Sequence, residues 1–298
     1  MGAKIIDGRA IAAKIRGRVA RTVRKLTMEG IEPGLGVVLV GQDSASISYV
    51  NSKEKDCDEV GIYSRDIKIP ADTSENELLS IVGSLNHDSR IHGILIQLPL
   101  PGHMDEERII AAISPEKDVD GFHPVNLGRL MLNLSCFIPC TPYGVIEILQ
   151  AENIRTEGAE IVLVGRSRVV GAPLANLLFR KGYGGNSTLT VCHSYTRNMK
   201  EVLSRGDIVI AAVGKPKLIR GDMIKRGAVV IDVGINRVED SSRKRGYRLV
   251  GDVDFDSVRE VAKAITPVPG GVGPLTRAML LWNTATAAQK FHSGKEEV

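Results

Sequence analysis

The sequence predicts an α/β protein built from two stretches in which short buried strands alternate with amphipathic helices. Apolar runs that end at glycine or proline recur along the 298 residues, and the segments between them carry apolar residues at helical spacing. Strands and helices that alternate in this way form βαβ units, so we expect mostly parallel, twisted sheets. A turn-rich segment over residues 114–142 separates the two stretches, and the chain is long enough for two domains.

The first stretch begins with a predicted helix over residues 8–26, whose apolar residues fall on one face. A strand follows and ends at Gly41. That strand covers residues 35–40. After it we predict, in order, a helix over 44–60, a strand over 63–69, a helix over 74–85 and a strand over 93–98. We expect residues 1–141 to form a first, catalytic domain.

In the second stretch, a helix over residues 143–152 is expected to link the two domains, because Pro142 can open a helix. The predicted strands lie at residues 161–164, 188–192, 208–213 and 228–233, with a short one around Leu249. Residues 142–274 therefore form the second predicted domain. The last helix is long enough to cross back, so residues 275–298 are expected to complete the first domain.

Composition narrows the class of protein. Hydrophobic content is 43% and charged content 25%, which is typical of a globular chain. The net charge of +4 is too mild to indicate nucleic-acid binding, and it suits an anionic small molecule. No apolar run approaches a membrane span and no signal-peptide core is present, so we expect a cytoplasmic protein. The four scattered cysteines predict neither a disulfide framework nor a metal site.

The most informative segment is IVLVGRSRVVGAPLANLL, residues 161–178. A buried strand runs into Gly165, a polar turn follows, and a helix then begins, which is the arrangement that holds a nucleotide phosphate. The usual fingerprint has glycines through this turn, whereas here it carries Arg166, Ser167 and Arg168. Taken alone, the segment is equally compatible with an ordinary strand–helix turn whose arginines meet solvent.

A second strand end sharpens this interpretation. Strand TLTVC is followed by His193 and Ser194, where a dinucleotide fold normally has an acid for the ribose hydroxyls. The missing acid and the cationic Arg166 favour NADP over NAD, and the two could converge on one 2′-phosphate. Ser194 as a helix N-cap is the alternative. Gly214 and Gly234 end two more strands at the same predicted ligand edge.

The first domain carries the catalytic candidates. Tyr49 and Lys53 lie four residues apart and so share a helix face. A lysine in a cleft suits general acid–base chemistry, and a tyrosine beside it can stack on a flat substrate. The alternative is a solvated helical face. A Tyr-x-x-x-Lys pair also marks short-chain dehydrogenases, but there it follows the nucleotide site, and here it precedes it.

Three further polar residues and one loop add to this set. Gln97 ends a buried strand and needs a hydrogen-bonding partner if it is buried. Asp118 and Asp120 lie on the loop PEKDVDGFHP, and a carboxylate there could accept two N–H bonds from an aminopyrimidinone ring. Turn formation is the alternative for both. The loop TPVPGGVGPLT offers backbone N–H groups and close approach.

Together these segments resemble one family, the bifunctional 5,10-methylenetetrahydrofolate dehydrogenase/5,10-methenyltetrahydrofolate cyclohydrolases. The segments that carry the resemblance are YVNSK, GILIQLPLP, PEKDVDGFHPVN, CFIPCTP, GRSRVVGAP, CHSYT, VIDVGIN, GDVDF and ITPVPGGVGPLT. The resemblance implies a cleft between two α/β domains, the second of them Rossmann-like and NAD(P)-binding, and a homodimer. It also implies NADP-linked oxidation of methylenetetrahydrofolate, followed by hydrolysis to 10-formyltetrahydrofolate in the same cleft.

The resemblance implies a role for individual residues. Lys53 matches the catalytic lysine, Tyr49 the ring-stacking tyrosine and Gln97 the glutamine that contacts the lysine. With the residue patterns above, the expected substrate site is Tyr49, Gln97, Asp120, Pro269, Gly270 and Gly273. The expected cofactor site is Gly165, Arg166, Ser167, Ser194, Gly214, Gly234 and Ile235.

The chain departs from the family pattern in a few places. The loop over residues 181–186 is longer than is common, and Tyr195 stands where many relatives carry a basic residue. We expect both to lie near the adenosine phosphate. Arg277 and Trp282 on the last helix have no explanation in the sequence. Two other functions stay open: an unrelated NADP oxidoreductase and a non-catalytic NADP-binding regulator, which would not need the first-domain set.

Overall fold

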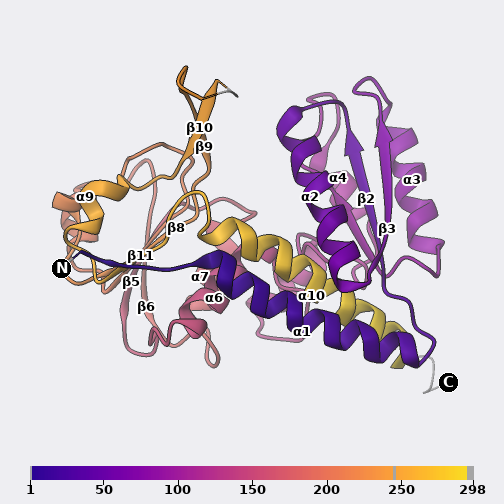
Figure 1. Cartoon of the computed structure of the whole chain (residues 1–298), viewed down its shortest axis with the longest axis horizontal. Coiled ribbons are helices and arrows are strands. Elements are labelled where there is room, and N and C mark those ends of the chain that lie inside the picture. Colours follow the sequence, from indigo (N-terminus) through magenta and orange to yellow (C-terminus); the bar gives the residue numbers. More distant parts are fainter. Residues whose placement is uncertain (1, 244–245, 294–298) are drawn as a thin grey trace. The chain divides into compact units, whose positions relative to one another are not determined.

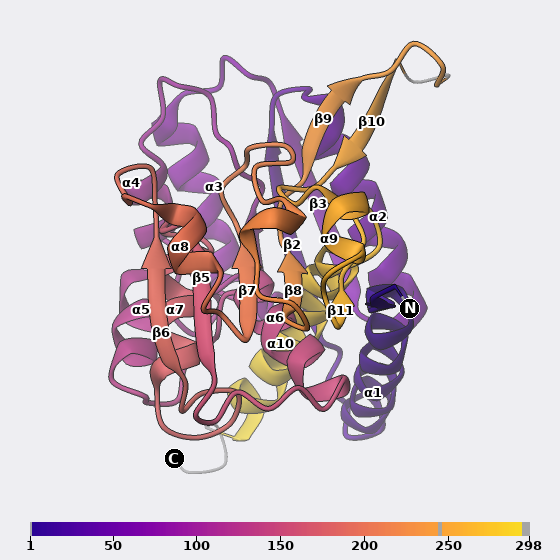
Figure 2. The same ribbon diagram turned by 90° about the vertical axis from the view of Figure 1, so that its left-hand side faces the viewer.

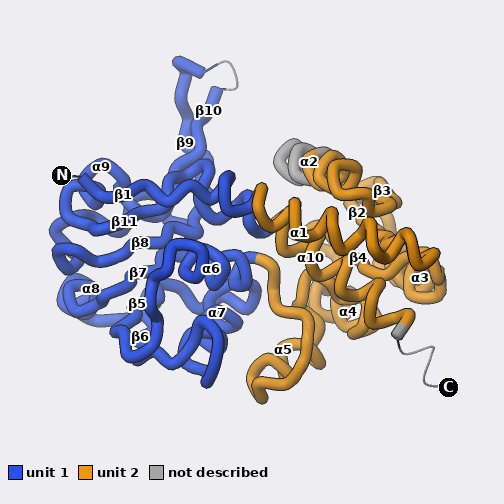
Figure 3. The backbone as a smooth tube through the Cα atoms, turned by 60° about the horizontal axis from the view of Figure 1, so that its bottom comes forward, with its two compact units in different colours: residues 1–12, 141–276 blue, residues 13–140, 277–298 orange. Residues whose placement is uncertain are grey.

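The structure is a computed structural model, and it describes residues 2–243 and 246–293, without the side chains of residues 44–49, 51 and 293. The chain forms two compact units (Figure 3). Unit 1 comprises residues 1–12 and 141–276, and unit 2 comprises residues 13–140 and 277–298. The predicted class, α/β with mostly parallel sheets, is confirmed. None of the helices in the described ranges is long and apolar enough to cross a membrane.

Unit 2 is built around a short parallel sheet in the order β3–β2–β4. Its strands are β2 (Gly34–Val40), β3 (Tyr63–Ile69) and β4 (Gly93–Ile96). Every residue of the central strand β2 is buried, as its unbroken apolar run predicts for a strand with neighbours on both sides. Strand β4 ends two residues before the predicted end, and the Gln97 N–H still bonds to the Val38 carbonyl at 2.9 Å. Gln97 is therefore placed at the carboxyl end of the sheet.

The helices of unit 2 lie around this sheet (Figure 1), and two of them, over residues 75–87 and 106–111, bury apolar side chains against its strands. The helices of this unit are α2 (Ser44–Val60), α3 (Glu75–His87), α4 (Glu106–Ala111), α5 (Pro124–Met131) and most of α1 (Gly8–Met28) and α10 (Val272–Ser293). Helix α3 starts with a capping box, in which Ser74 and Glu77 satisfy each other's backbone N–H groups. Helix α10 begins three residues earlier than predicted, because residues 272–274 continue the helix despite Gly273 and Pro274.

Unit 1 contains a six-stranded sheet in the order β1–β11–β8–β7–β5–β6, and each neighbouring pair is parallel (Figure 2). The strands are β1 (Lys4–Ile5), β5 (Glu160–Val164), β6 (Thr188–Cys192), β7 (Ile208–Ala211), β8 (Val229–Asp232) and β11 (Ala264–Ile265). Helices α6 (Cys140–Ala151), α7 (Gly171–Phe179), α8 (Met199–Leu203) and α9 (Phe255–Arg259) belong to the same unit. The sequence does not predict strands β1 and β11, because each has only two residues and so shows no periodicity.

An antiparallel ribbon extends beyond the carboxyl ends of the unit 1 strands (Figure 2). It pairs β9 (Asn236–Glu239) with β10 (Tyr247–Val250). The predicted short strand around Leu249 is therefore confirmed, but its partner β9 was missed. The reason is that β9 is largely polar and continues directly from the glycine turn that ends β8.

Candidate active site

Lys53 is the central side chain of the candidate site in unit 2. It lies on the buried face of α2 and is only 5% exposed, while its neighbours Glu54 and Lys55 face solvent. Its ammonium donates a hydrogen bond to Gln97 Oε1 at 3.0 Å. The Gln97 amide nitrogen donates to the Leu98 carbonyl at 2.8 Å, which turns the oxygen toward the lysine. A solvated helical face is therefore the wrong interpretation for Lys53.

Burial makes Lys53 suitable for proton transfer near neutral pH. Removal from water disfavours the charged ammonium and lowers the pKa of Lys53 to about 8, although the carboxylate of Asp120 opposes this shift. A lysine with this pKa can both hold and accept a proton at physiological pH, which is what general acid–base catalysis requires. The side chain of Tyr49 lies outside the described residues, so its predicted stacking position stays a prediction.

The structure gives the two loop aspartates different tasks. Asp118 is 1% exposed, and its carboxylate accepts bonds from the N–H groups of Gly121, Phe122 and His123 and from the Asn126 amide. The turn-forming alternative is thus confirmed for Asp118. Asp120 instead interacts with Lys53 and with the thiol of Cys140. Burial raises the pKa of Asp120, and the lysine opposes that rise.

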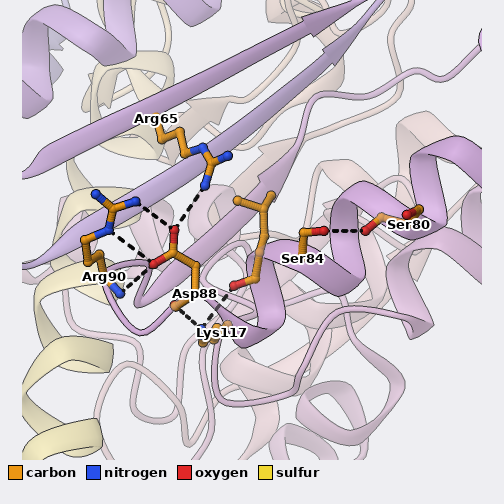
Figure 4. Close-up of polar contacts among 7 residues, drawn as sticks. Arg65, Ser80, Ser84, Asp88, Arg90 and Lys117 are labelled. Carbon is orange, nitrogen blue, oxygen red and sulfur yellow. Dashed lines mark hydrogen bonds and ion pairs between the residues drawn. The ribbon is translucent and has the colours of Figure 1, made fainter.

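Lys117 fixes the start of this loop, and sequence reasoning missed it (Figure 4). It is 6% exposed, and its ammonium donates to the carbonyls of Leu85 at 3.1 Å and Asp88 at 2.8 Å, at the carboxyl end of α3. Cations are favoured there because the last helical carbonyls lack partners. The Asp88 carboxylate also accepts from Arg65 at 3.0 Å and from Arg90. The loop that carries Asp120 is therefore tied to the body of unit 2 just before the aspartate.

Cys140 is a second residue that sequence reasoning missed. Its buried thiol lies 3.4 Å from the Val119 carbonyl, and it interacts with Asp120 and Lys53. Burial and the neighbouring carboxylate raise the pKa of Cys140 well above its usual value, so the thiol is protonated and unreactive. The segment CFIPCTP gives no local signal that its second cysteine meets a loop some twenty residues earlier.

The structure also explains the two unusual residues on α10. The Arg277 guanidinium pairs with Asp56 at 3.3 Å, one turn after Lys53 on α2. Arg18 of α1 lies over the ring of Trp282, 5.5 Å from its centre. Arg277 therefore ties α10 to the helix that carries Lys53.

In unit 1, the turn after β5, which the sequence predicts to bind phosphate, brings backbone segments into close contact. Gly165 has a φ of +125°, and a Cβ there would lie 2.1 Å from the Ala212 carbonyl oxygen. A Cβ on Gly171 would lie 2.5 Å from the Gly165 carbonyl oxygen. Both positions therefore require glycine. Ser167 Oγ accepts from the N–H groups of Val170 at 3.2 Å and Gly171 at 3.3 Å, at the start of α7.

Arg166 and Ser194, which we expect to bind the 2′-phosphate, follow the ends of the neighbouring strands β5 and β6. The Arg166 guanidinium lies over the ring of Tyr195, 5.9 Å from its centre, and Ser194 is exposed beside it in the chain. An exposed cation, a hydroxyl and a strand end without an acid fit a phosphate on the adenosine ribose. Tyr195 is 81% exposed and contacts Arg166, and its position near the adenosine phosphate stays a prediction.

The lengthened loop does not lie where we expected it. The Asn186 carbonyl accepts from Gly158 at 2.9 Å and the Gly185 carbonyl from Thr156 at 2.8 Å, ahead of β5. Residues 181–186 therefore lie at the amino end of β6, whereas Ser194 follows its carboxyl end. The expectation that this loop lies near the adenosine phosphate is wrong, because the chain crosses the full length of β6 in between.

The remaining predicted residues all belong to unit 1. Gly214 and Gly234 follow the ends of β7 and β8, with Ile235 exposed next to Gly234. A Cβ on Gly273 would lie 3.7 Å from Ile235 Cδ1, so the glycine-rich loop with Pro269 and Gly270 adjoins this group. Among the described residues, no group of three or more His, Cys, Asp or Glu side chains is arranged to bind a metal ion.

Comparison with known proteins identifies the family. Residues 6–120 match the model of the tetrahydrofolate dehydrogenase/cyclohydrolase catalytic domain, and residues 139–292 match its NAD(P)-binding domain. The chain belongs to the tetrahydrofolate dehydrogenase/cyclohydrolase family. Lys53, Gln97 and Asp120 fall within the first match, and the phosphate-binding turn falls within the second. Membership excludes an unrelated oxidoreductase and a short-chain dehydrogenase.

Individual relatives cover almost the whole chain. The bifunctional protein FolD of Geotalea uraniireducens is 55% identical over 97% of this chain and 99% of its own. The crystal structure of FolD from Campylobacter jejuni is 45% identical, with a TM-score of 0.91 over 97% of this chain and 99% of its own. The Trypanosoma brucei FolD structure, complexed with NADP and an inhibitor, is 40% identical, with a TM-score of 0.93 over 98% of this chain and 99% of its own. The α/β fold of both units is therefore that of the family.

Proposed function

We propose that this protein oxidises 5,10-methylenetetrahydrofolate to 5,10-methenyltetrahydrofolate with NADP and then hydrolyses the product to 10-formyltetrahydrofolate. Membership of the dehydrogenase/cyclohydrolase family supports the two reactions. The observation that carries the site is the buried Lys53 ammonium held by Gln97 at 3.0 Å. We assign residues 1–141 with 275–298 to the folate-binding domain, although residues 1–12 fold with unit 1, and residues 142–274 to the cofactor-binding domain, whose glycine-rich loop also contacts the folate.

The oxidation depends on positioning more than on a base. A bound NADP would supply the hydride acceptor for the one-carbon bridge. On the protein side, the Asp120 carboxylate accepts N–H bonds from the aminopyrimidinone ring, and Tyr49 stacks on the ring system. Because no proton must leave in this step, orientation supplies the main part of the acceleration.

The hydrolysis requires proton transfer, and Lys53 is the group we assign to it. Water attacks the methenyl carbon, and the neutral lysine takes the proton that the water releases. The protonated lysine then returns that proton to the ring nitrogen. As the carbon–nitrogen bond opens, the hydroxyl on the carbon releases its remaining proton to solvent and becomes the formyl carbonyl. Gln97 Oε1 accepts from the lysine at 3.0 Å and so fixes its direction. Acid–base help of this kind contributes roughly a hundred- to ten-thousand-fold.

The cofactor site assigns separate tasks to separate residues. Gly165 and Ser167 shape the turn that meets the diphosphate, and Arg166 with Ser194 binds the 2′-phosphate. Gly214, Gly234 and Ile235 present backbone to the nicotinamide half, and Pro269, Gly270 and Gly273 do so to the folate. An arginine is suited to the 2′-phosphate because its planar guanidinium can bind phosphate through two N–H groups.

The setting of the reaction is part of the same proposal. We assign a homodimer in the cytoplasm, supported by the family resemblance. A net charge of +4 without a long basic run supports small-molecule substrates and no nucleic-acid partner. No membrane partner is assigned.

One assay tests the proposal. Methylenetetrahydrofolate is supplied with NADP or with NAD, and the reduced cofactor and the methenyl intermediate are followed together. We expect both to form with NADP and the methenyl compound to be hydrolysed. A chain that neither turns over folates nor is protected by them against heat would refute the function.

A further inference from the structure

Two aspartates that no step above uses are buried together in unit 1. Asp232 is the last residue of β8, and Asp252 follows β10 and contacts the turn after β7. Asp232 is 3% exposed and Asp252 is fully buried. Within the described part of the chain, no lysine or arginine pairs with either carboxylate. Burying unpaired carboxylates is costly, so two of them at one sheet edge call for an explanation.

Backbone N–H groups, rather than cations, hold these carboxylates. Asp252 Oδ2 accepts from Val213 N at 2.6 Å and Gly214 N at 3.0 Å, and Oδ1 accepts from the Asn236 amide at 2.9 Å. Asp252 therefore joins the turn after β7 to the start of the ribbon.

Asp232 makes the complementary set of bonds. Its Oδ1 accepts from Gly234 N and Asp252 N, both at 3.0 Å, and its Oδ2 accepts from Val253 N at 2.9 Å. Its own N–H donates to the Thr266 hydroxyl at 2.8 Å, at the start of the glycine-rich loop. The pair thus connects the turns after β7 and β8, the start of the ribbon and the start of the glycine-rich loop.

The fit around the pair is tight. A Cβ on Gly251 would lie 1.7 Å from Asp232 Oδ2, and a Cβ on Gly234 would lie 2.3 Å from Asp252 Oδ1. The segment GDVDF, which includes Gly251 and Asp252, therefore has a physical role in holding these turns.

We propose that Asp232 and Asp252 are positioning residues that hold the Gly214 and Gly234 turns in the shape that binds the nicotinamide half of the cofactor. The inference rests on the proposed function, because that function places the nicotinamide at these turns. It concerns the oxidation step, since the hydrolytic lysine belongs to unit 2.

Asp232→Asn is the sharpest variant. Both oxygens of Asp232 accept backbone N–H groups, so either orientation of an asparagine amide sets its NH₂ against a donor. We expect NADP and NAD affinity to weaken about tenfold each, because one buried hydrogen-bond mismatch is of that size. The measurement is calorimetric titration of the full chain with each cofactor. Asp252→Asn is expected to be milder, because Asn236 can turn its amide oxygen toward the new NH₂.

A pH series separates positioning from a general structural role. Burial and the charge of Asp252 raise the pKa of Asp232 to about 7. Asp252 is the charged neighbour, and the other groups facing Asp232 are the three backbone N–H groups and Thr266. A protonated Asp232 accepts fewer bonds, so wild-type cofactor affinity should fall as pH drops through about 7. Asp232→Asn should lose that component.

Two further variants and one activity complete the test. Gly251→Ala should weaken cofactor binding by displacing Asp232, whereas Asp207→Asn, at the amino end of the same sheet, should not. Hydrolysis of the methenyl compound without cofactor should fall much less than cofactor affinity does. Unchanged cofactor affinity in a folded Asp232→Asn protein, or an equal loss of hydrolysis, would overturn the inference. A wild-type chain that binds NADP but does not turn over folates would refute the proposed function and leave the affinity comparison standing.

Discussion

The candidate site in unit 2 is made of side chains, whereas the one in unit 1 is made mostly of backbone. In unit 2, the buried Lys53 meets the partly buried Gln97 and Asp120, and burial lowers the pKa of the lysine to about 8. In unit 1, glycines at 165 and 171 let backbone pack at distances that no side chain permits. Proton transfer needs a group with a tuned pKa, whereas a cofactor needs a surface of the right shape. Substitutions in the two units should therefore fail in different ways.

The largest effect is expected at Lys53. Lys53→Ala removes the proton-transfer group and should lower the hydrolysis rate by roughly a hundred- to ten-thousand-fold, with a smaller loss of oxidation. Separate assays of the two activities measure this split. Lys55→Ala, on the exposed face of the same helix, is the matched control and should leave both rates unchanged. Normal hydrolysis by the Lys53 variant would remove the lysine from the mechanism.

Next in size is the effect at Arg166. Arg166→Ala should weaken NADP binding by about ten- to a hundredfold and NAD binding far less, because charged hydrogen bonds to a phosphate contribute roughly 1.5 to 3 kcal/mol. Titration with both cofactors measures the ratio. Arg226→Ala, an exposed arginine elsewhere in unit 1, serves as the control. An equal loss for both cofactors would mean that Arg166 does not bind the 2′-phosphate.

A pH profile tests the tuning of Lys53 itself. The neutral amine is the base, and the pKa of Lys53 is about 8, so hydrolysis should rise about tenfold from pH 7 toward pH 9 and then level off. The same shift affects folding. Lys53 binds its proton less tightly in the folded chain than in the unfolded chain. The free energy of unfolding should therefore be highest above the unfolded pKa near 10.5, where the lysine is neutral in both states, and should decrease as pH falls through about 8. A flat hydrolysis profile across this range would contradict the assignment.

The smallest effect concerns the tie between α10 and α2. Arg277→Gln removes the ion-pair partner of the mostly buried Asp56 and should lower the free energy of unfolding by roughly 1 to 2 kcal/mol. Burial already raises the pKa of Asp56 and Arg277 opposes that rise. The loss should therefore shrink at low pH, where Asp56 is protonated. Urea denaturation at two pH values measures it, with Arg24→Gln as an exposed control. A loss that does not depend on pH would point away from Asp56.

Local patterns were sufficient for most of the elements and for the chemical types at each site. The apolar runs predicted β2, β5 and β8, and the strand–turn–helix pattern located Gly165 and Arg166. Helical spacing placed Lys53 on α2, but it did not show that the lysine side is buried and the Lys55 side is not. That distinction depends on what packs against the helix.

Local sequence determined the α/β class, the order of its elements and the residues able to move a proton or bind a phosphate, because these follow from spacing and side-chain chemistry. Tertiary structure decided which of those residues meet. It paired Lys4–Ile5 with β11. It assigned turn formation to Asp118 and the lysine contact to Asp120, and it brought Cys140 next to Asp120 and Lys53. It also joined Arg277 to Asp56 and Asp232 to Asp252. Apart from the local turn at Asp118, each of these depends on contacts between segments that are distant in the chain. Neither periodicity nor residue type records which segments come together.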